Sequence, residues 1–159
     1  MPSGAKKAFN TKLTDTSTTD DEGVGVLRWE GNKCYKWVLY ESGAGSVAAA
    51  SGKVAYYYAA SGTSAGDYAN HKVTCDLSDS SEIGAGVMQA AVADASYGWM
   101  QIKGAATLSV SLTAGADGDP LTATGASDGT LDVTAAATSP IVAFADDASA
   151  DKIICDFPF

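Results

Sequence analysis

The stretch YGWMQIKGAATLSV, residues 97–110, decides the fold class of this chain. Its first half, residues 97–103, alternates large apolar side chains with small and polar ones, the two-residue period of a strand with one buried face. The pair Lys103-Gly104 predicts a break, after which residues 105–110 form a second alternating strand. These are β-forming residues, and no group of His, Cys or carboxylate side chains accompanies them.

The same pattern recurs along the rest of the chain. Short runs of apolar and β-branched residues are separated by loops rich in Gly, Ser, Asp and Ala, which favour tight turns. A short helix is the alternative for residues 83–92. About ten short strands at near-regular spacing predict an all-β fold, a single sandwich or barrel-like domain over residues 23–159. The further predicted strands are residues 24–30, 33–40, 54–60, 71–77, 83–92, 120–124, 130–135, 141–145 and 152–157.

The first two strands are predicted to form a hairpin around Gly31-Asn32, a two-residue turn. This register pairs Trp29 with Cys34 on one face and Val26 with Trp37 on the other. It also pairs Val24 with Leu39. Two tryptophans therefore lie on opposite faces, so that one face packs in the core and the other is left to meet a partner.

Composition and charge exclude several classes of function. The chain has 159 residues, of which 10 are Lys or Arg and 19 are Asp or Glu, giving a net charge of -9. Such an acidic protein is a poor binder of nucleic acid or of an anionic membrane, so we expect neither partner. Nothing approaches 18 consecutive apolar residues, and the sequence after Lys6-Lys7, AFNTKLTDT, lacks the apolar region of a secretory signal.

The three cysteines are Cys34, Cys75 and Cys155. Their odd number and wide spacing favour buried thiols in a chain that folds in a reducing cytoplasm. A metal site is the alternative, but no C-x-x-C spacing occurs, and the single histidine, His71, lies four residues before Cys75. We expect no metal and no cofactor.

Residues 1–22 differ from the body. They show neither hydrophobic period, and Lys6, Lys7 and Lys12 make the first 19 residues basic although the remainder is acidic. We expect an extended N-terminal arm that becomes ordered on a partner, either a neighbouring copy or another acidic surface. A frayed terminus is the alternative. The candidate contact residues of the arm are Lys6, Lys7, Phe9, Lys12 and Leu13.

Three patterns could carry a ligand or chemistry. Gly62-Thr63-Ser64-Ala65-Gly66 matches the G-x-S-x-G nucleophile motif, but it lacks the strand-turn-helix context that the motif needs. Asp76, Asp79 and Glu82 could hold Ca²⁺, although a solvated acidic loop explains them as well. The aromatic side chains of the strands could form a sugar-binding platform, but strand aromatics more often belong to the core. We therefore expect no enzymatic activity.

Five motifs in sequence order resemble a known family. They are a Gly-x-Gly strand, a Gly-Trp-x-Gln-x-x-Gly strand, Gly-Asp-x-Leu, Ser-Asp-Gly-x-Leu and Ile-Val-x-x-Ala, at residues 84–87, 98–104, 118–121, 127–131 and 141–145. This order is similar to that of the small capsid decoration, or cement, proteins of tailed bacteriophages. The resemblance covers residues 23–157, and it does not extend to the arm.

The resemblance implies a function. Family members are β-rich, assemble mainly as trimers, and sit on the outer capsid surface at threefold or quasi-threefold positions, where they clamp neighbouring capsid subunits. For this chain it implies a structural protein of the virion, made in the host cytoplasm, with the major capsid protein and further copies of itself as partners. The alternative is a carbohydrate-binding or adhesin-type β-sandwich, which would present a planar row of exposed aromatic side chains.

Overall fold

The computed structural model describes residues 8–59 and 71–159. The regular structure of these residues consists almost entirely of strands. Two 3-10 turns, η2 (Leu77–Asp79) and η3 (Ala148–Ala150), lie between strands. The predicted all-β class is confirmed, and residues 83–92 contain a strand rather than a helix. In chain order the strands are β1 (Thr16–Ser17), β2 (Leu27–Glu30), β3 (Lys33–Tyr40), β4 (Val54–Tyr58), β5 (Lys72–Thr74), β6 (Ser80–Met88), β7 (Ser96–Thr107), β8 (Pro120–Thr122), β9 (Asp132–Val133), β10 (Ala143–Asp147) and β11 (Lys152–Asp156).

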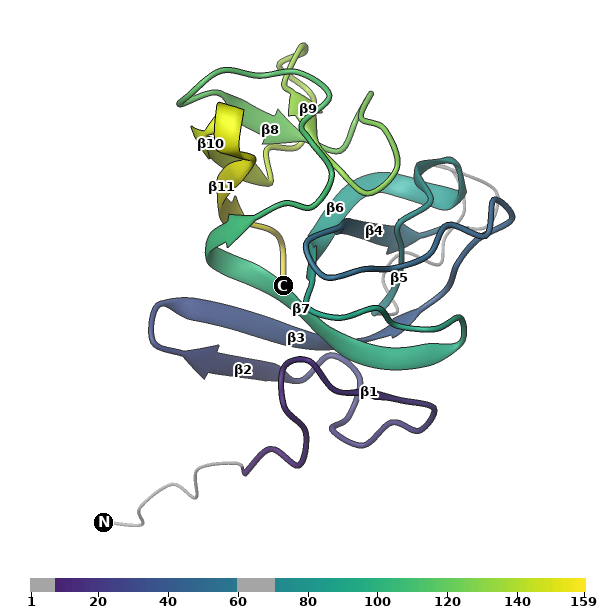
Figure 1. Cartoon of the computed structure of the whole chain (residues 1–159). Coiled ribbons are helices and arrows are strands. Elements are labelled where there is room, and N and C mark those ends of the chain that lie inside the picture. The colour runs from purple at the N-terminus through teal and green to yellow at the C-terminus, as the bar shows by residue number, and fades with distance from the viewer. Residues whose placement is uncertain (1–7, 60–70) are drawn as a thin grey trace.

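All these strands belong to one mixed sheet, which closes partly on itself. Its order is β2-β3-β5-β4-β6-β7-β11-β10-β8-β9, and β1 pairs with β7. Because β3 also pairs with β7, the strands β3, β5, β4, β6 and β7 form a closed ring. Strands β11, β10, β8 and β9 continue from β7 as a curled extension (Figure 1), and β2 lies beyond β3 at the other end of the sheet. The domain is therefore barrel-like, with an added wall of antiparallel strands.

Strand β7 joins the ring to the extension, and here the predicted break is wrong. The structure has one continuous strand from Ser96 to Thr107. Gly104 lies inside it with φ +91, a conformation that other residues rarely adopt. A Cβ atom at Gly104 would lie 2.8 Å from the carbonyl oxygen of Asn32. Gly104 thus lets β7 bend and change partners, from β3 to β11, without ending the strand.

The predicted hairpin is confirmed at its turn. Trp29 pairs with Cys34 and Glu30 with Lys33. The first strand is shorter than predicted, because a turn in which Val26 donates its N–H to Gly23 ends the pairing. Trp37 still donates its backbone N–H to Val26, but Val24 does not continue the ladder to Leu39.

The core fills the ring and runs without interruption under the extension. Alternate residues of each strand point inward, and the small residues between them let the walls approach closely. A Cβ atom at Gly84 in β6, for example, would lie 2.9 Å from Cε1 of the buried Phe157, which follows β11. One buried cluster therefore joins both parts of the sheet, and its members include Val38, Tyr56, Val73, Met100, Ile102, Leu121, Leu131, Ile153 and Phe157.

Candidate protein-binding surface

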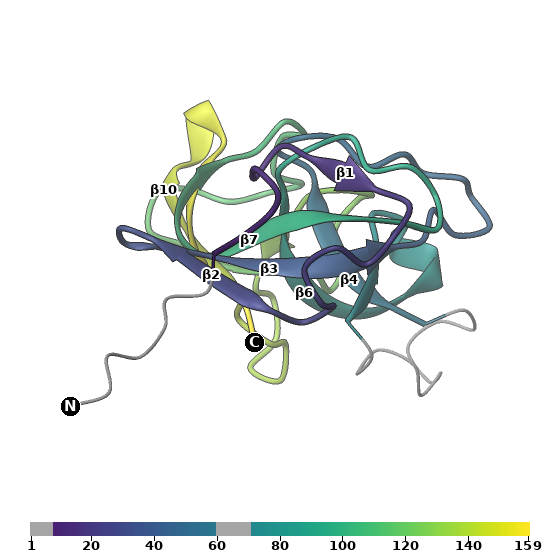
Figure 2. The same ribbon diagram turned by 90° about the horizontal axis from the view of Figure 1, so that it is seen from below.

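The N-terminal segment, residues 8–22, lies across the outer face of β3 and β7 (Figures 1 and 2). It covers the tryptophan cluster, which consists of the buried side chains of Tyr35, Trp37 and Trp99. Its strand β1 pairs with residues 97–98 of β7. The segment thus adds a short strand to the sheet of its own chain.

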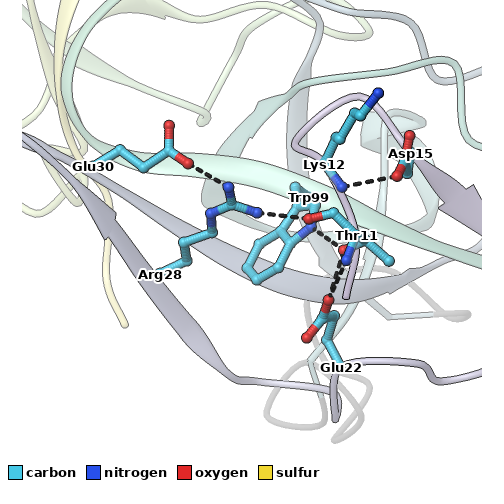
Figure 3. Close-up of polar contacts among 7 residues, drawn as sticks. All are labelled: Thr11, Lys12, Asp15, Glu22, Arg28, Glu30 and Trp99. Atoms are coloured by element: carbon cyan, nitrogen blue, oxygen red, sulfur yellow. Dashed lines mark hydrogen bonds and ion pairs between the residues drawn. The ribbon is translucent and has the colours of Figure 1, made fainter. Parts of the chain in front are cut away.

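Thr11 fixes this segment through contacts with three side chains (Figure 3). The indole Nε1–H of Trp99 donates to Thr11 Oγ1 at 2.9 Å, and Arg28 donates to the Thr11 carbonyl oxygen at 2.7 Å. Thr11 in turn donates from its backbone N–H and its hydroxyl group to Glu22, at 2.7 and 2.8 Å. Farther along, Trp37 Nε1–H donates to Asp20 at 2.9 Å. Both buried indole N–H groups are therefore satisfied by the segment that covers them.

The candidate contact residues of the arm lie in different environments. Phe9 meets Trp99 edge-on, with ring centroids 5.5 Å apart, and Leu13 packs against the same cluster. Lys12 is exposed, and its backbone N–H donates to Asp15. Lys6 and Lys7 lie outside the described residues. The expectation that the arm needs another molecule to become ordered is wrong for residues 8–22, because its apolar side chains and polar backbone find partners on its own sheet.

An uncovered apolar surface lies on the outer face of the extension. Directly opposite residues of neighbouring strands share a face, and the register places Ala105 opposite Ile154, Ile154 opposite Phe144, and Phe144 opposite Pro120. These four residues are called the apolar row. Ile154 is 41% exposed and Phe144 43%, whereas the neighbours of Ile154 along β11 are buried. The extension therefore has apolar side chains on both of its faces.

Charged side chains border the apolar row. Lys103 pairs with Asp156 at 2.5 Å, and its ammonium group lies 4.9 Å from the centroid of the exposed Phe159 ring. On the other side of the row is a surface hollow of about 280 Å³. Ala105 contributes to both the row and the hollow, whose charged lining residues are Lys33, Asp146 and Lys152. The row is thus an apolar strip with a mixed-charge border, the composition of a protein-binding patch.

Most strand aromatics belong to the core, as predicted. Trp37, Tyr40, Tyr56 and Trp99 are fully buried, and Tyr35 and Tyr57 are nearly so. Burial away from water raises the pKa of both Tyr40 and Tyr56 above the ordinary value. Trp29 and Phe144 are exceptions, at 59% and 43% exposed, and they lie on strands toward opposite ends of the sheet. The described aromatics therefore do not line up as the exposed row that a sugar-binding platform requires.

The acidic loop has a structural role. Asp76 accepts a hydrogen bond from the backbone N–H of Gly45 at 2.9 Å, and Asp79 accepts one from Ala44. These carboxylates hold the loop that follows β3, and Glu82 lies apart from them in β6. Within the described part of the chain, no three His, Cys, Asp or Glu side chains are grouped so as to hold a metal ion.

The other predicted chemical groups are buried or lie outside the described residues. All three cysteines are free and buried, and burial raises the pKa of both Cys75 and Cys155 to about 12. These thiols therefore stay protonated and unreactive at neutral pH. The G-x-S-x-G motif at residues 62–66 lies outside the described residues. In the described ranges, no helix has the length and apolar character needed to span a bilayer.

Neither protein-family models nor curated proteins nor solved structures match this chain. The surfaces themselves are therefore the basis for any functional conclusion. Sequence analysis did not find the apolar row, although one signal for it was present. The adjacent pair Ile153-Ile154 must place one isoleucine on each face of a strand, because successive side chains point to opposite faces.

Proposed function

We propose that this chain is a structural protein of a phage virion, which binds the outer surface of the capsid and holds neighbouring capsid subunits together. The apolar row carries this proposal. A strip of four apolar residues across β7, β11, β10 and β8, with Phe144 and Ile154 well exposed, suits contact with another protein. The choice of the capsid as the partner rests on the order of the five sequence motifs, which resembles that of phage decoration proteins.

The proposed mechanism is mechanical. Complete burial of a side chain such as Ile or Phe contributes about 1.5–3 kcal/mol, so one apolar row gives only weak binding. A shell repeats its binding sites, and an oligomer of the chain would engage several of them at once. Effective concentration then converts many weak contacts into firm attachment. The exposed Lys12, together with Lys6 and Lys7, would add attraction to an acidic part of the shell that fades with salt.

The test uses shells of the phage that encodes this chain, prepared without it. We expect the wild-type protein to sediment together with these shells. The bound amount should reach a plateau that corresponds to a repeated site on the shell. Ile154→Asp and Phe144→Asp place a charge in the apolar row, and we expect binding to weaken roughly tenfold or more for each. Both side chains are exposed in the free protein, so folding should be unchanged.

The matched control is Val24→Asp, a change at a side chain that is also exposed, at 36%, but lies before β2 rather than in the row. It should bind shells as the wild type does. Wild-type protein that stays in the supernatant would contradict the capsid as partner. Row variants that bind as tightly as the control would contradict the apolar row as the contact surface.

A further inference from the structure

Strand β2 lies at one end of the sheet, with an open edge. Among the described residues β2 pairs only with β3, and Figure 2 shows it at the margin of the sheet. The opposite end is β9, which has two residues, one of them Asp132. Natural sheets protect their edges with very short strands and with charges, as at β9. The longer β2 carries Arg28 and Glu30, but these two charges pair with each other and leave no net charge at the edge.

The backbone of β2 offers hydrogen-bonding groups at this edge. Residues of an antiparallel strand alternate between those that bond to the neighbouring strand and those that point away. Trp37 of β3 donates to the carbonyl oxygen of Val26, so the residues that bond to β3 are Val26, Arg28 and Glu30. Leu27 and Trp29 therefore turn their backbone N–H and C=O groups toward the open edge.

The same two residues carry exposed apolar side chains on one face. Trp29 is 59% exposed and Leu27 36%. On the other face, Arg28 and Glu30 form an ion pair at 2.5 Å. The edge thus combines free backbone groups, an exposed indole and a locally neutral pair of charges on a chain whose net charge is -9.

We propose that two copies of this chain pair through β2, antiparallel and centred on Trp29. In this register Trp29 lies opposite Trp29 of the second copy, and the two residues exchange a pair of backbone hydrogen bonds. Arg28 then lies opposite Glu30 of the second copy, and the reverse pair forms by symmetry. The contact is a closed twofold one, with the same strand on both sides.

Charge selects this register over its neighbours. In this register the numbers of two opposite residues add up to 58. The neighbouring registers that keep the same side chains on each face have sums of 56 and 60. One of these registers places Arg28 opposite Arg28 of the second copy, and the other places Glu30 opposite Glu30. Like charges directly opposite each other destabilise a strand pair. Only the register centred on Trp29 opposes unlike charges, and this pairing does not depend on the proposed attachment to a capsid.

The first test substitutes the central residue. Trp29→Lys and Trp29→Glu each place like charges opposite each other in the pair, and the exposed side chain can change without loss of folding. By sedimentation equilibrium we expect the mass of the wild-type particle to double with concentration up to about 1 mM. Each variant alone should lose this doubling, whereas an equimolar mixture of the two should recover it.

Every other pattern overturns the proposal. Wild-type protein that does not double, or variants that double alone, would show that β2 is not the contact. A mixture of the two variants that remains undoubled would show that Trp29 does not lie opposite itself. Circular dichroism and the midpoint of thermal unfolding should be the same for all three proteins, which confirms that only the association has changed.

A covalent test places the twofold axis. Trp29→Cys would bring two thiols together across the axis, with Cα atoms about 5.5 Å apart, inside the range of a disulfide. We expect mild oxidation to cross-link this variant into a dimer. Leu27→Cys is the matched control, exposed on the same face but displaced from the axis, and it should remain uncross-linked. Equal cross-linking of both variants would overturn the register.

Discussion

Lys36 is a charged residue placed where the fold favours an apolar one. Its side chain is 1% exposed, and Nζ donates to the hydroxyl group of Tyr57 at 3.0 Å and lies 5.2 Å from the ring centroid. Burial lowers the pKa of Lys36 below its ordinary value of 10.5, because the interior disfavours the ammonium form. The pattern KCYKWVLY, residues 33–40, does not reveal this, since Lys36 occupies an inward position of an otherwise apolar face.

We predict that Lys36→Met stabilises the protein by about 1–3 kcal/mol at pH 7, because it removes a buried charge and keeps the volume of the side chain. In the wild type the unfolded chain binds the proton more tightly, so the free energy of unfolding should rise as pH increases from the folded-state pKa toward 10.5. The advantage of the variant should therefore shrink over this window. Urea unfolding of both proteins from pH 7 to 10 checks the difference, and a variant that is less stable at pH 7 would contradict the argument.

At the scale of elements, the N-terminal segment covers the tryptophan cluster although it contributes few apolar side chains. Phe9 and Leu13 contact the tryptophan cluster, and indole N–H groups supply two of the hydrogen bonds to the segment. Sequence analysis recognised that residues 1–22 could not fold alone. It could not name the partner, because the apolar face that receives the segment is created only when β3 and β7 pair.

Deletion of residues 1–20 should leave the sheet folded but uncover Trp37 and Trp99. We expect the free energy of unfolding to fall by about 2–4 kcal/mol, mainly through lost burial of apolar surface. The fluorescence emission of the two tryptophans should shift to longer wavelength. Trp29→Phe provides the background for this measurement, because Trp29 is exposed in any case. Unchanged stability and emission after the deletion would show that the segment does not cover the cluster in solution.

At the scale of the whole molecule, the prediction concerns assembly. The resemblance to decoration proteins implies a trimer, and strands rich in Ala and Gly permit close packing between subunits. Light scattering on the purified protein should give three times the mass of one chain. If copies also pair through β2, the measured mass should rise further, up to twofold, as the protein concentration increases. A strict monomer at tens of micromolar, both free in solution and on capsids, would contradict the trimer.

The sequence by itself determined the strand content, the hairpin turn at Gly31-Asn32 and the burial of the cysteines. The strands and the turn depend on local signals, a two-residue period and a turn-forming pair, and the buried thiols on the odd number and wide spacing of the cysteines. The ranges that became strands were mostly found, with ends that moved by a few residues. Pattern alone also showed that Trp29 and Trp37 lie on opposite faces of one hairpin.

Only the tertiary structure decided which of these faces is covered. Trp37 is buried because residues 8–22 and β7 lie over it, and Trp29 is exposed because β2 extends beyond the ring. The apolar row likewise exists only after β7, β11, β10 and β8 align. The physical reason is that alternation fixes which side chains share a face, whereas pairing between segments far apart in the sequence fixes what lies against that face.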